Sequence, residues 1–159
     1  MKLRPVAQSH SFLVAILLLS PGLAFGQSPM EFAGKWVLDL DKMANVHPEW
    51  QGELTRDLWI ATGYSDRILR ISRGVEVTEV RRADDDERYD LDGATTRIPY
   101  GDSRAEVVAH WEQDRVVATV TPLNGDPALI RRIYRDEQWL VIEESEEGSG
   151  PFRWYFVKT

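Results

Sequence analysis

The sequence lacks the residues and motifs that several common protein classes require. Its 159 residues include no cysteine, which excludes disulfides, thiolate metal sites, a cysteine nucleophile and a cysteine-linked lipid anchor. It also contains no Gly-x-Ser-x-Gly, Gly-x-Gly-x-x-Gly, P-loop or His-Glu-x-x-His pattern. We therefore assign no catalytic residue, no cofactor and no metal site, although catalysis is unsupported rather than excluded.

Clusters of basic residues are missing as well. Lys and Arg total 19 against 26 Asp and Glu, which gives a net charge of −7. Since an acidic surface repels phosphate backbones, nucleic acid is not an expected partner. The six Trp, five Tyr and five Phe residues argue against disorder and for a folded domain.

Only one long apolar run occurs, and it lies near the amino terminus. Basic residues precede this run at 12–19, and small residues flank Phe25 just after it, which is the order of a secretory signal peptide. We expect cleavage after Gly26, which gives a signal peptide at 1–26 and a single domain at 27–159. The run is too short to span a bilayer, and no transmembrane segment is expected in the mature chain. The prediction is an exported, monomeric protein that is periplasmic or secreted.

The mature part shows no helical period and instead repeats short runs that alternate between apolar and polar residues. In residues 32–40, Trp36, Leu38 and Leu40 fall on one face, the pattern of a strand with one buried side. Further short runs of this β-prone kind lie at 54–61, 67–72, 75–82, 88–91, 95–98, 105–111, 116–121, 128–134, 139–144 and 152–158. Connections this short join antiparallel neighbours. We therefore predict an all-β fold, an antiparallel up-and-down meander of about 8–10 strands closed into a barrel, with a two-sheet sandwich as the alternative.

Several connections carry specific expectations. Asp92-Gly93 between two β-prone runs predicts a hairpin turn, and residues 62–65 predict another turn. Residues 41–51 are long enough for a lid or one helical turn. The acidic run at 84–87 lacks the spacing of a calcium loop and is expected to be a charged hairpin tip.

The first strand carries a motif of a known superfamily. Phe32-x-Gly34-x-Trp36 near the mature amino terminus, followed by a β meander of this length, resembles the calycin superfamily of lipocalins and fatty-acid-binding-protein-like barrels. It is most similar to the small exported lipocalin-like proteins of bacteria, and the resemblance covers residues 31–159. It implies a barrel that binds a small apolar or amphipathic molecule, with Gly34 and Trp36 serving structural closure.

The same resemblance implies two different roles for Arg153. In lipocalins a late arginine packs across the first-strand tryptophan, which would make Arg153 a structural closure residue over Trp36. In fatty-acid-binding proteins an Arg-x-Tyr pair on the last strand holds the ligand carboxylate, and Arg153-Trp154-Tyr155 matches that spacing. The chain departs from the second family, which is normally cytosolic and has two helices after the first strand.

Two neighbouring arginines are candidates for contact with a ligand. Arg131 and Arg132 point to opposite faces of their strand, because successive side chains alternate. An inward arginine would be a buried charge that needs an anionic partner, either a ligand head group or Glu143 or Glu144 on the next strand. The candidate ligand-binding residues are Trp111, Arg131, Arg132, Trp154 and Tyr155.

A polar strand face supports a different class of function. Glu106, His110 and Glu112 share one face of residues 105–113, where they could ligate zinc or act as acid and base. A solvated outer face explains them equally well. The main hypothesis is therefore an exported lipocalin-like protein that binds a small apolar or amphipathic ligand. The alternative is a cell-envelope protein-interaction module with a filled barrel core and no small-molecule ligand, and a barrel enzyme is the third hypothesis.

Overall fold

The computed structural model describes residues 28–46, 58–75 and 86–159. The elements in chain order are η1 (Pro29–Phe32), β1 (Gly34–Leu38), α1 (Leu40–Val46), β2 (Leu58–Ser65), β3 (Ile68–Val75), β4 (Glu87–Asp90), β5 (Asp92–Tyr100), β6 (Ser103–Glu112), β7 (Arg115–Pro122), β8 (Leu129–Asp136), β9 (Trp139–Glu146) and β10 (Phe152–Lys158). The predicted signal peptide, residues 47–57 and residues 76–82 of one predicted strand therefore lie outside the described residues, as do 84 and 85 of the acidic run.

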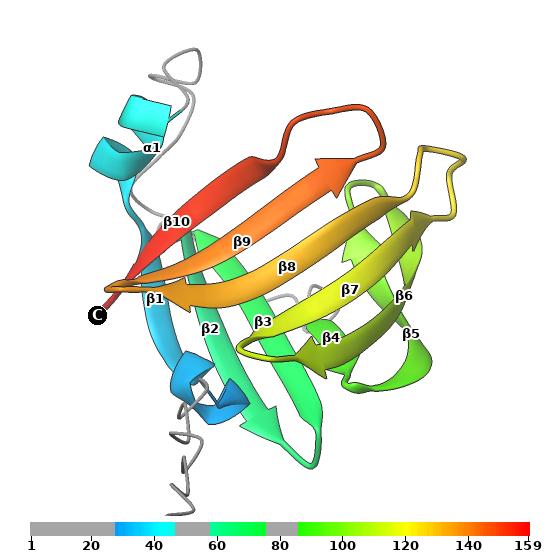
Figure 1. Cartoon of the computed structure of the whole chain (residues 1–159), viewed down its shortest axis with the longest axis horizontal. Coiled ribbons are helices and arrows are strands. Elements are labelled where there is room, and N and C mark those ends of the chain that lie inside the picture. The colour runs from blue at the N-terminus through cyan, green and yellow to red at the C-terminus, as the bar shows by residue number, and fades with distance from the viewer. Residues whose placement is uncertain (1–27, 47–57, 76–85) are drawn as a thin grey trace, which may run out of the picture.

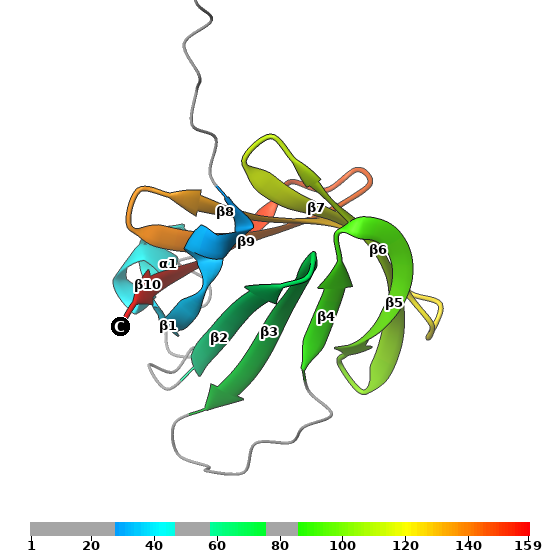
Figure 2. The ribbon, with the colours of Figure 1, turned by 90° about the horizontal axis from the view of Figure 1, so that it is seen from below.

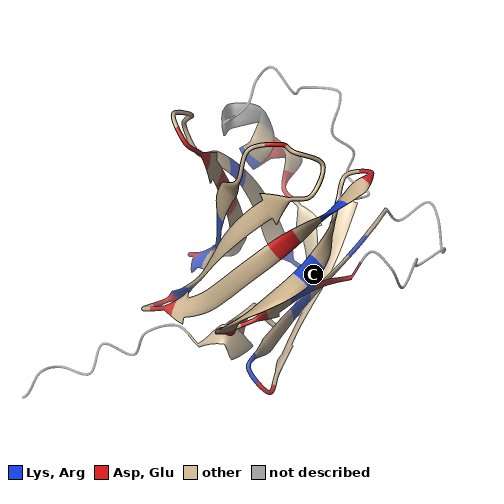
Figure 3. Cartoon of the chain, turned by 90° about the vertical axis from the view of Figure 1, so that its right-hand side faces the viewer, with Lys and Arg blue, Asp and Glu red and all other residues tan. Residues whose placement is uncertain are grey.

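The ten strands form one antiparallel sheet that curls into a nearly closed barrel (Figures 1, 2 and 3). The strand order is β4-β3-β2-β1-β10-β9-β8-β7-β6-β5, so the first strand pairs with both the second and the last. The two edge strands, β4 and β5, meet at a seam where the Thr96 hydroxyl donates to the Arg88 carbonyl at 2.7 Å. The prediction of an all-β antiparallel barrel is confirmed.

The hairpin predicted at Asp92-Gly93 is not formed, because β4 and β5 are the two edge strands and are not paired in the sheet. Asp92 begins β5 and pairs with His110 of β6, whereas β4 pairs with β3. Gly93 has φ +84° next to a register shift in the β5–β6 ladder, so its conformational freedom serves an irregular strand start. The Asp-Gly pair therefore lies where the chain passes from β4, at one edge of the sheet, to β5, at the other edge. The local sequence of such a connection is the same as that of a hairpin turn.

The turn after β2 lies later in the chain than predicted. β2 continues through residues 62–65, and the reversal falls at Asp66 and Arg67, with φ of 49° and 66°. Two central residues with positive φ match the right-handed twist of a two-residue hairpin. This turn sets the β2–β3 register, in which Ser65 pairs with Ile68.

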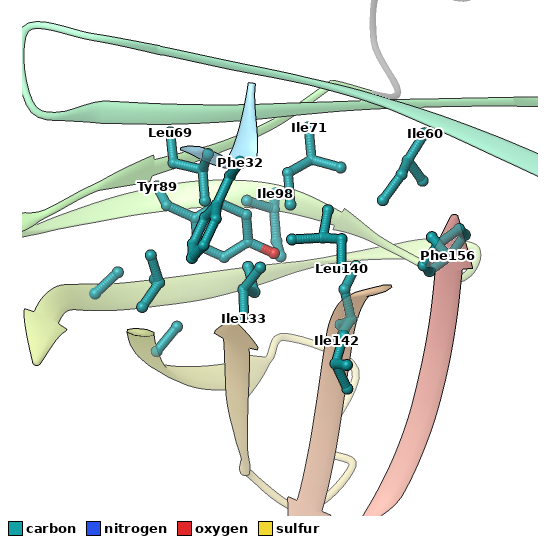
Figure 4. Packing of buried hydrophobic residues seen from close by; sticks show 14 of the residues in the cluster. Phe32, Ile60, Leu69, Ile71, Tyr89, Ile98, Ile133, Leu140, Ile142 and Phe156 are labelled. Atoms are coloured by element: carbon teal, nitrogen blue, oxygen red, sulfur yellow. The ribbon is translucent and has the colours of Figure 1, made fainter. Parts of the chain in front are cut away.

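The apolar faces of the strands fill much of the barrel interior. β6 buries Ala105, Val107 and Ala109 and exposes Val108 and His110, as its alternation predicts. Figure 4 shows side chains from opposite walls meeting across this interior. The labelled residues of this core are Phe32, Ile60, Leu69, Ile71, Tyr89, Ile98, Ile133, Leu140, Ile142 and Phe156.

One end of the barrel is packed shut around Trp36. The ring is fully buried, and its Nε1 donates to the Phe32 carbonyl at 2.9 Å and to the Thr62 hydroxyl at 3.2 Å. The Thr62 hydroxyl also donates to the Phe32 carbonyl, which ties η1 to β2. Phe32 packs on Trp111 with ring centroids 5.5 Å apart. A ligand space in this barrel must therefore lie toward the other end.

The two short helices lie at opposite ends of β1 (Figure 1). α1 is held to the barrel by Lys42, whose Nζ lies 4.4 Å from the Trp139 ring centroid and 5.0 Å from that of Tyr155. Asp39, just before α1, accepts from Trp139 Nε1 at 2.8 Å. The segment after β1 thus contains a helix, as its length allowed. In the described part of the chain, no helix is long and apolar enough to cross a membrane.

Candidate ligand pocket

A pocket of about 440 Å³ lies at the end of the barrel opposite Trp36. It is formed where β2, β4 and β10 begin and where β3 and β5 end. Its lining residues are Leu58, Arg73, Gly74, Glu87, Pro99, Tyr100, Gly101, Arg131, Glu144 and Trp154. The volume is within the range of small-molecule sites, and the lining combines aromatic, apolar and charged side chains.

Arg131 is the central charged residue of this pocket. Its side chain is 5% exposed, and all three guanidinium nitrogens donate hydrogen bonds. Nε and Nη2 donate to Glu144 Oε1 at 2.8 and 2.5 Å, and Nη1 donates to Glu87 Oε2 at 3.1 Å and to the Tyr89 hydroxyl. These bonds connect β8 to its neighbour β9 and, across the interior, to β4. Arg131 is thus compensated entirely from within the protein.

Glu87 is the buried carboxylate at the centre of the same network. Its side chain is 6% exposed and accepts from Tyr89 Oη at 2.5 Å, while Arg73 Nη2 lies 2.9 Å from its Oε1. Burial works to raise the pKa of Glu87, but the positive charges of Arg73 and Arg131 outweigh it and the pKa is lowered. Glu87 is therefore ionised at neutral pH and forms a true ion pair with both arginines.

Tyr89 and Arg131, which both contact Glu87, keep their ordinary protonation states at neutral pH. Burial raises the pKa of Tyr89, so its hydroxyl remains a neutral donor to Glu87. Burial works to lower the pKa of Arg131, but Tyr89, Glu87 and Glu144 more than offset it and the pKa lies well above its usual range. The network is consequently a fixed arrangement of charges and dipoles.

Strand register explains why these residues meet. Arg131 pairs directly with Glu144 in the β8–β9 ladder, so both side chains point to the same face of the sheet. Arg73 lies two residues after Ile71, a core residue, and therefore shares its inward face. Glu87 lies two residues before buried Tyr89 in β4. Each charged residue thus occupies an inward position at the end of an apolar strand face.

A second, adjoining pocket of about 280 Å³ shares Tyr100 and Glu144 with the first. It lies between the end of β5 and the β9–β10 connection, and Phe152 contributes an aromatic wall that packs on Trp154 at 5.0 Å between centroids. Burial, followed by the carboxylates of Glu144, Asp126 and Glu146, raises the pKa of Tyr100. The phenol therefore stays neutral where the two pockets join.

The outer face of the same strands carries a separate polar cluster. Glu143 accepts from Arg132 Nη1 at 3.2 Å and from Arg153 Nε at 2.6 Å, and Tyr134 Oη lies 3.5 Å away. The side chains of Arg132 and Arg153 are 34% and 40% exposed. The hydrogen bond from Arg153 to Glu143 raises the pKa of Arg153. The two arginines are therefore partly exposed, whereas Glu143 between them is buried, and none of these residues lines the 440 Å³ pocket.

Two of the five predicted ligand-binding residues, Arg131 and Trp154, line the pocket. The other three lie elsewhere. Trp111 packs on Phe32 at the closed end, because its position near the end of β6 falls there. Arg132 pairs with Glu143 on the outer face, as the alternative of a cross-strand partner predicted for it.

Tyr155 is the third predicted pocket residue that lies elsewhere. It occupies the outer face of β10, buried beneath Lys42 and against Trp139. It shares this face with Arg153, so their spacing matches the Arg-x-Tyr pattern without placing either group in the barrel. The sequence spacing was sufficient to put them on one face and insufficient to say which face.

The predicted closure residues divide in a similar way. Gly34 and Trp36 lie at the closed end, and Gly34 has φ +145° with Lys158 Cε only 2.9 Å from where a Cβ would stand. The cation closest over the Trp36 ring is Arg135, at 4.9 Å from the centroid, followed by Lys158 at 5.4 Å. Arg153 is bound to Glu143 instead. The arginine that covers the tryptophan is therefore on β8 rather than β10.

The polar face of β6 is an outer surface. The side chains of His110 and Glu112 are 56% and 58% exposed, with 3.9 Å between His110 Nε2 and Glu112 Oε2, and Glu106 pairs with exposed Arg97 at 3.0 Å. These residues form no cleft, which contradicts the enzyme hypothesis built on them. Over the described residues, no group of three or more His, Cys, Asp or Glu side chains is arranged to hold a metal ion.

Sequence reasoning missed three residues of the pocket network: Arg73, Glu87 and Tyr89. Glu87 was assigned to a charged hairpin tip because it follows three aspartates, whereas the structure buries it in β4. The signal that could have placed it was its two-residue spacing from Tyr89, an aromatic on the same strand face. Arg73 could have been found by extending the Leu69 and Ile71 face by two residues.

Known structures share this fold at low sequence identity. No family model matches the sequence, and no curated protein matches it. Apo lipid binding protein 8 from Caenorhabditis elegans is 12% identical with a TM-score of 0.62, covering 84% of this chain and 99% of that one. Secretory abundant heat soluble protein 4 from Ramazzottius varieornatus is 11% identical with a TM-score of 0.59, covering 84% and 97%.

A Schistosoma mansoni fatty acid binding protein in complex with arachidonic acid is similar as well. It is 12% identical with a TM-score of 0.58, and the match covers 83% of this chain and 99% of that one. At these identities the likeness is one of fold. The chain has the fold of the calycin-like barrels, and its pocket residues have to be interpreted on their own chemistry.

Proposed function

We propose that this protein binds a small apolar or amphipathic molecule in the pocket lined by Arg131 and Trp154. The observation that carries the proposal is the composition of that pocket: about 440 Å³ of space with apolar and aromatic walls and a small set of fixed polar groups. Apolar walls supply binding free energy by removing ligand surface from water, and a few oriented polar groups fix its orientation.

The fold neighbours support the same class of ligand. They include the fatty acid binding protein in complex with arachidonic acid and the lipid binding protein already described, and each matches this chain over most of its length. At 12% identity, what this chain shares with them is the barrel fold. The chemical class of the ligand is therefore inferred from the residues that line the pocket of this protein.

The proposal includes export of the mature domain. The order of basic, apolar and small residues in 1–26 supports cleavage after Gly26 and function outside the cytoplasm. Expression of the full chain followed by fractionation and amino-terminal sequencing tests this part. A mature terminus at Gln27 in the exported fraction supports it, whereas an intact terminus in the cytosol contradicts it.

Native mass spectrometry of the mature domain isolated from its exported fraction tests ligand binding. We expect a stoichiometric small molecule that is released on denaturation. A Leu58→Trp variant would fill the pocket with a larger side chain and should lose this molecule. The matched control is Leu123→Trp, which makes the same change at a side chain on an exposed turn.

The interaction-module alternative predicts an apolar patch on the outside of the barrel. Within the described residues, the exposed large hydrophobic side chains are Met30, Val108 and Leu123, which lie on η1, β6 and the turn after β7. Clean apo protein that also fails to bind added amphipaths, in both the parent and the Leu58→Trp variant, would favour that alternative.

A further inference from the structure

The charged groups that line the pocket are already paired with one another. Among the described lining residues these are Arg73 and Arg131, which carry positive charge, and Glu87 and Glu144, which carry negative charge. Glu87 lies within 3.1 Å of both arginines. The lining is therefore electrically balanced before any ligand enters.

Glu87 occupies the place that a ligand carboxylate would need. A carboxylate that entered the barrel would find its strongest partners in two arginines and a tyrosine hydroxyl, and all three already bind Glu87. The remaining nitrogens of Arg131 donate to Glu144. An acidic ligand would bring a third carboxylate next to two arginines, and its desolvation would be left uncompensated.

One donor in the pocket still lacks an acceptor. Arg73 Nε is buried and has no hydrogen-bond partner within the described part of the chain. An uncharged oxygen, such as that of an amide, ester or alcohol, adds no charge to the balanced lining, and it can accept from Arg73 Nε once a shift of the partly exposed Arg73 side chain uncovers this nitrogen. A buried donor left unpaired is costly, so such a contact favours binding.

We propose that the pocket selects amphipathic molecules with an uncharged polar head group over the corresponding carboxylic acids and amines. This inference rests on the proposed function, because it names the ligand class for the same pocket. The head group lies at Arg73, and the apolar chain lies along Leu58, Pro99 and Trp154. Glu87 acts as an internal carboxylate that excludes acidic ligands by occupying the cationic groups.

A matched set of ten-carbon ligands tests this selectivity. Decanamide, decanoate and decylammonium share a chain and differ in head-group charge, and their binding to the mature domain can be measured by displacement of Nile red and by calorimetry at pH 8. We expect decanamide to bind at least about tenfold more tightly than either charged ligand, since an uncompensated buried charge is unfavourable.

Charge-neutralising variants test the role assigned to Glu87. Glu87→Gln frees the two arginines and should reduce the preference for decanamide over decanoate to about threefold or less, or reverse it. Glu143→Gln makes the same change on the outer face and should leave the preference unaltered. If Glu87→Gln does not fold, as circular dichroism will show, Glu144→Gln adds the same net charge to the pocket and should act in the same direction.

The outcomes separate the two levels of the proposal. Equal or tighter binding of decanoate or decylammonium by the parent protein overturns the selectivity and leaves ligand binding intact. Unchanged selectivity in both pocket variants overturns the role of Glu87. Failure of all three ligands to bind, with no displacement of the dye, overturns the proposed function together with this inference.

Discussion

The two faces of the β8–β9 pair show how the same residue types behave in two environments. Arg131 and Glu144 pair on the inner face, and Arg132 and Glu143 pair one position away on the outer face. The Arg131 side chain is 5% exposed, whereas that of Arg132 is 34% exposed. The inner pair recruits Glu87 from across the barrel, and the outer pair recruits Arg153 from the adjacent strand.

The burial of the arginine, rather than the number of its bonds, determines how strongly such a cluster affects stability. The arginines on the outer face, Arg132 and Arg153, are partly exposed and screened by water, so each ion pair that they form with Glu143 contributes little to stability. Charges on the inner face have lost their hydration, and removing one partner leaves the other uncompensated. The inner cluster should therefore be sensitive to mutation and the outer cluster tolerant of it, although both are arginine–glutamate networks.

The largest expected effect comes from removing the inner arginine. Arg131→Met keeps a similar volume but leaves Glu87 with Arg73 as its remaining cation, and it should lower the free energy of unfolding by about 3–5 kcal/mol. Arg132→Met, the matched outer change, should cost about 1 kcal/mol or less. Urea unfolding of both variants measures the difference. Equal losses of unfolding free energy in the two variants would contradict the difference that burial predicts between the inner and outer clusters.

Tyrosine hydroxyls allow a finer comparison of the two faces. Tyr89→Phe removes a buried hydroxyl that donates to Glu87 and accepts from Arg131, and it should cost about 1–3 kcal/mol. Tyr134→Phe removes an outer hydroxyl at 3.5 Å from Glu143 and should cost about 0.5 kcal/mol or less. Thermal unfolding at matched concentration gives both values. A larger loss at Tyr134 would contradict the ranking.

Acid should destabilise the inner cluster through Glu87. The pKa of Glu87 is lower in the folded protein than in the unfolded chain, so the unfolded state binds more protons as the pH falls. Its contribution to stability is therefore present above the unfolded pKa, near 4.3, and is lost as the pH falls through the folded pKa. Unfolding free energies measured from about pH 6 to pH 2 should decline less steeply in Glu87→Gln than in the parent protein. Identical slopes would contradict the ionised state of Glu87.

The barrel could be predicted from sequence because a strand with one buried face is encoded locally. The alternation in β6 and β7 gave both the strands and their inward residues, since period two depends only on neighbouring positions. The prediction of a hairpin at Asp92-Gly93 was wrong because two edge strands and two hairpin strands have the same local sequence pattern. Which strands pair depends on how the whole sheet closes, and a dipeptide does not determine it.

The candidate site could be predicted only in part for a related reason. Alternation required Arg131 and Arg132 to face opposite ways, but the register with β9 decides which of them is inside. Glu87 was hidden because three aspartates precede it in sequence, and composition suggested a solvated tip. Its buried charge is compensated by Arg73 on the preceding strand and by Arg131 on β8, a strand distant in sequence. Long-range charge compensation of this kind has no local signature.

The smallest expected effects on stability come from Arg153, which was predicted to cover Trp36, and from Arg135, which covers it in the structure. Arg135 lies 4.9 Å from the Trp36 centroid, whereas Arg153 binds Glu143 on the outer face. Arg135→Gln should therefore change the near-ultraviolet circular dichroism of the buried indole and cost about 0.5–1 kcal/mol. Arg153→Gln should leave that spectrum unchanged and cost no more than a surface ion pair, about 0–1 kcal/mol. Because the two variants make the same chemical change, the spectrum isolates position as the cause. A tryptophan signal that responds to Arg153→Gln and not to Arg135→Gln would show that Arg153 of β10 covers Trp36.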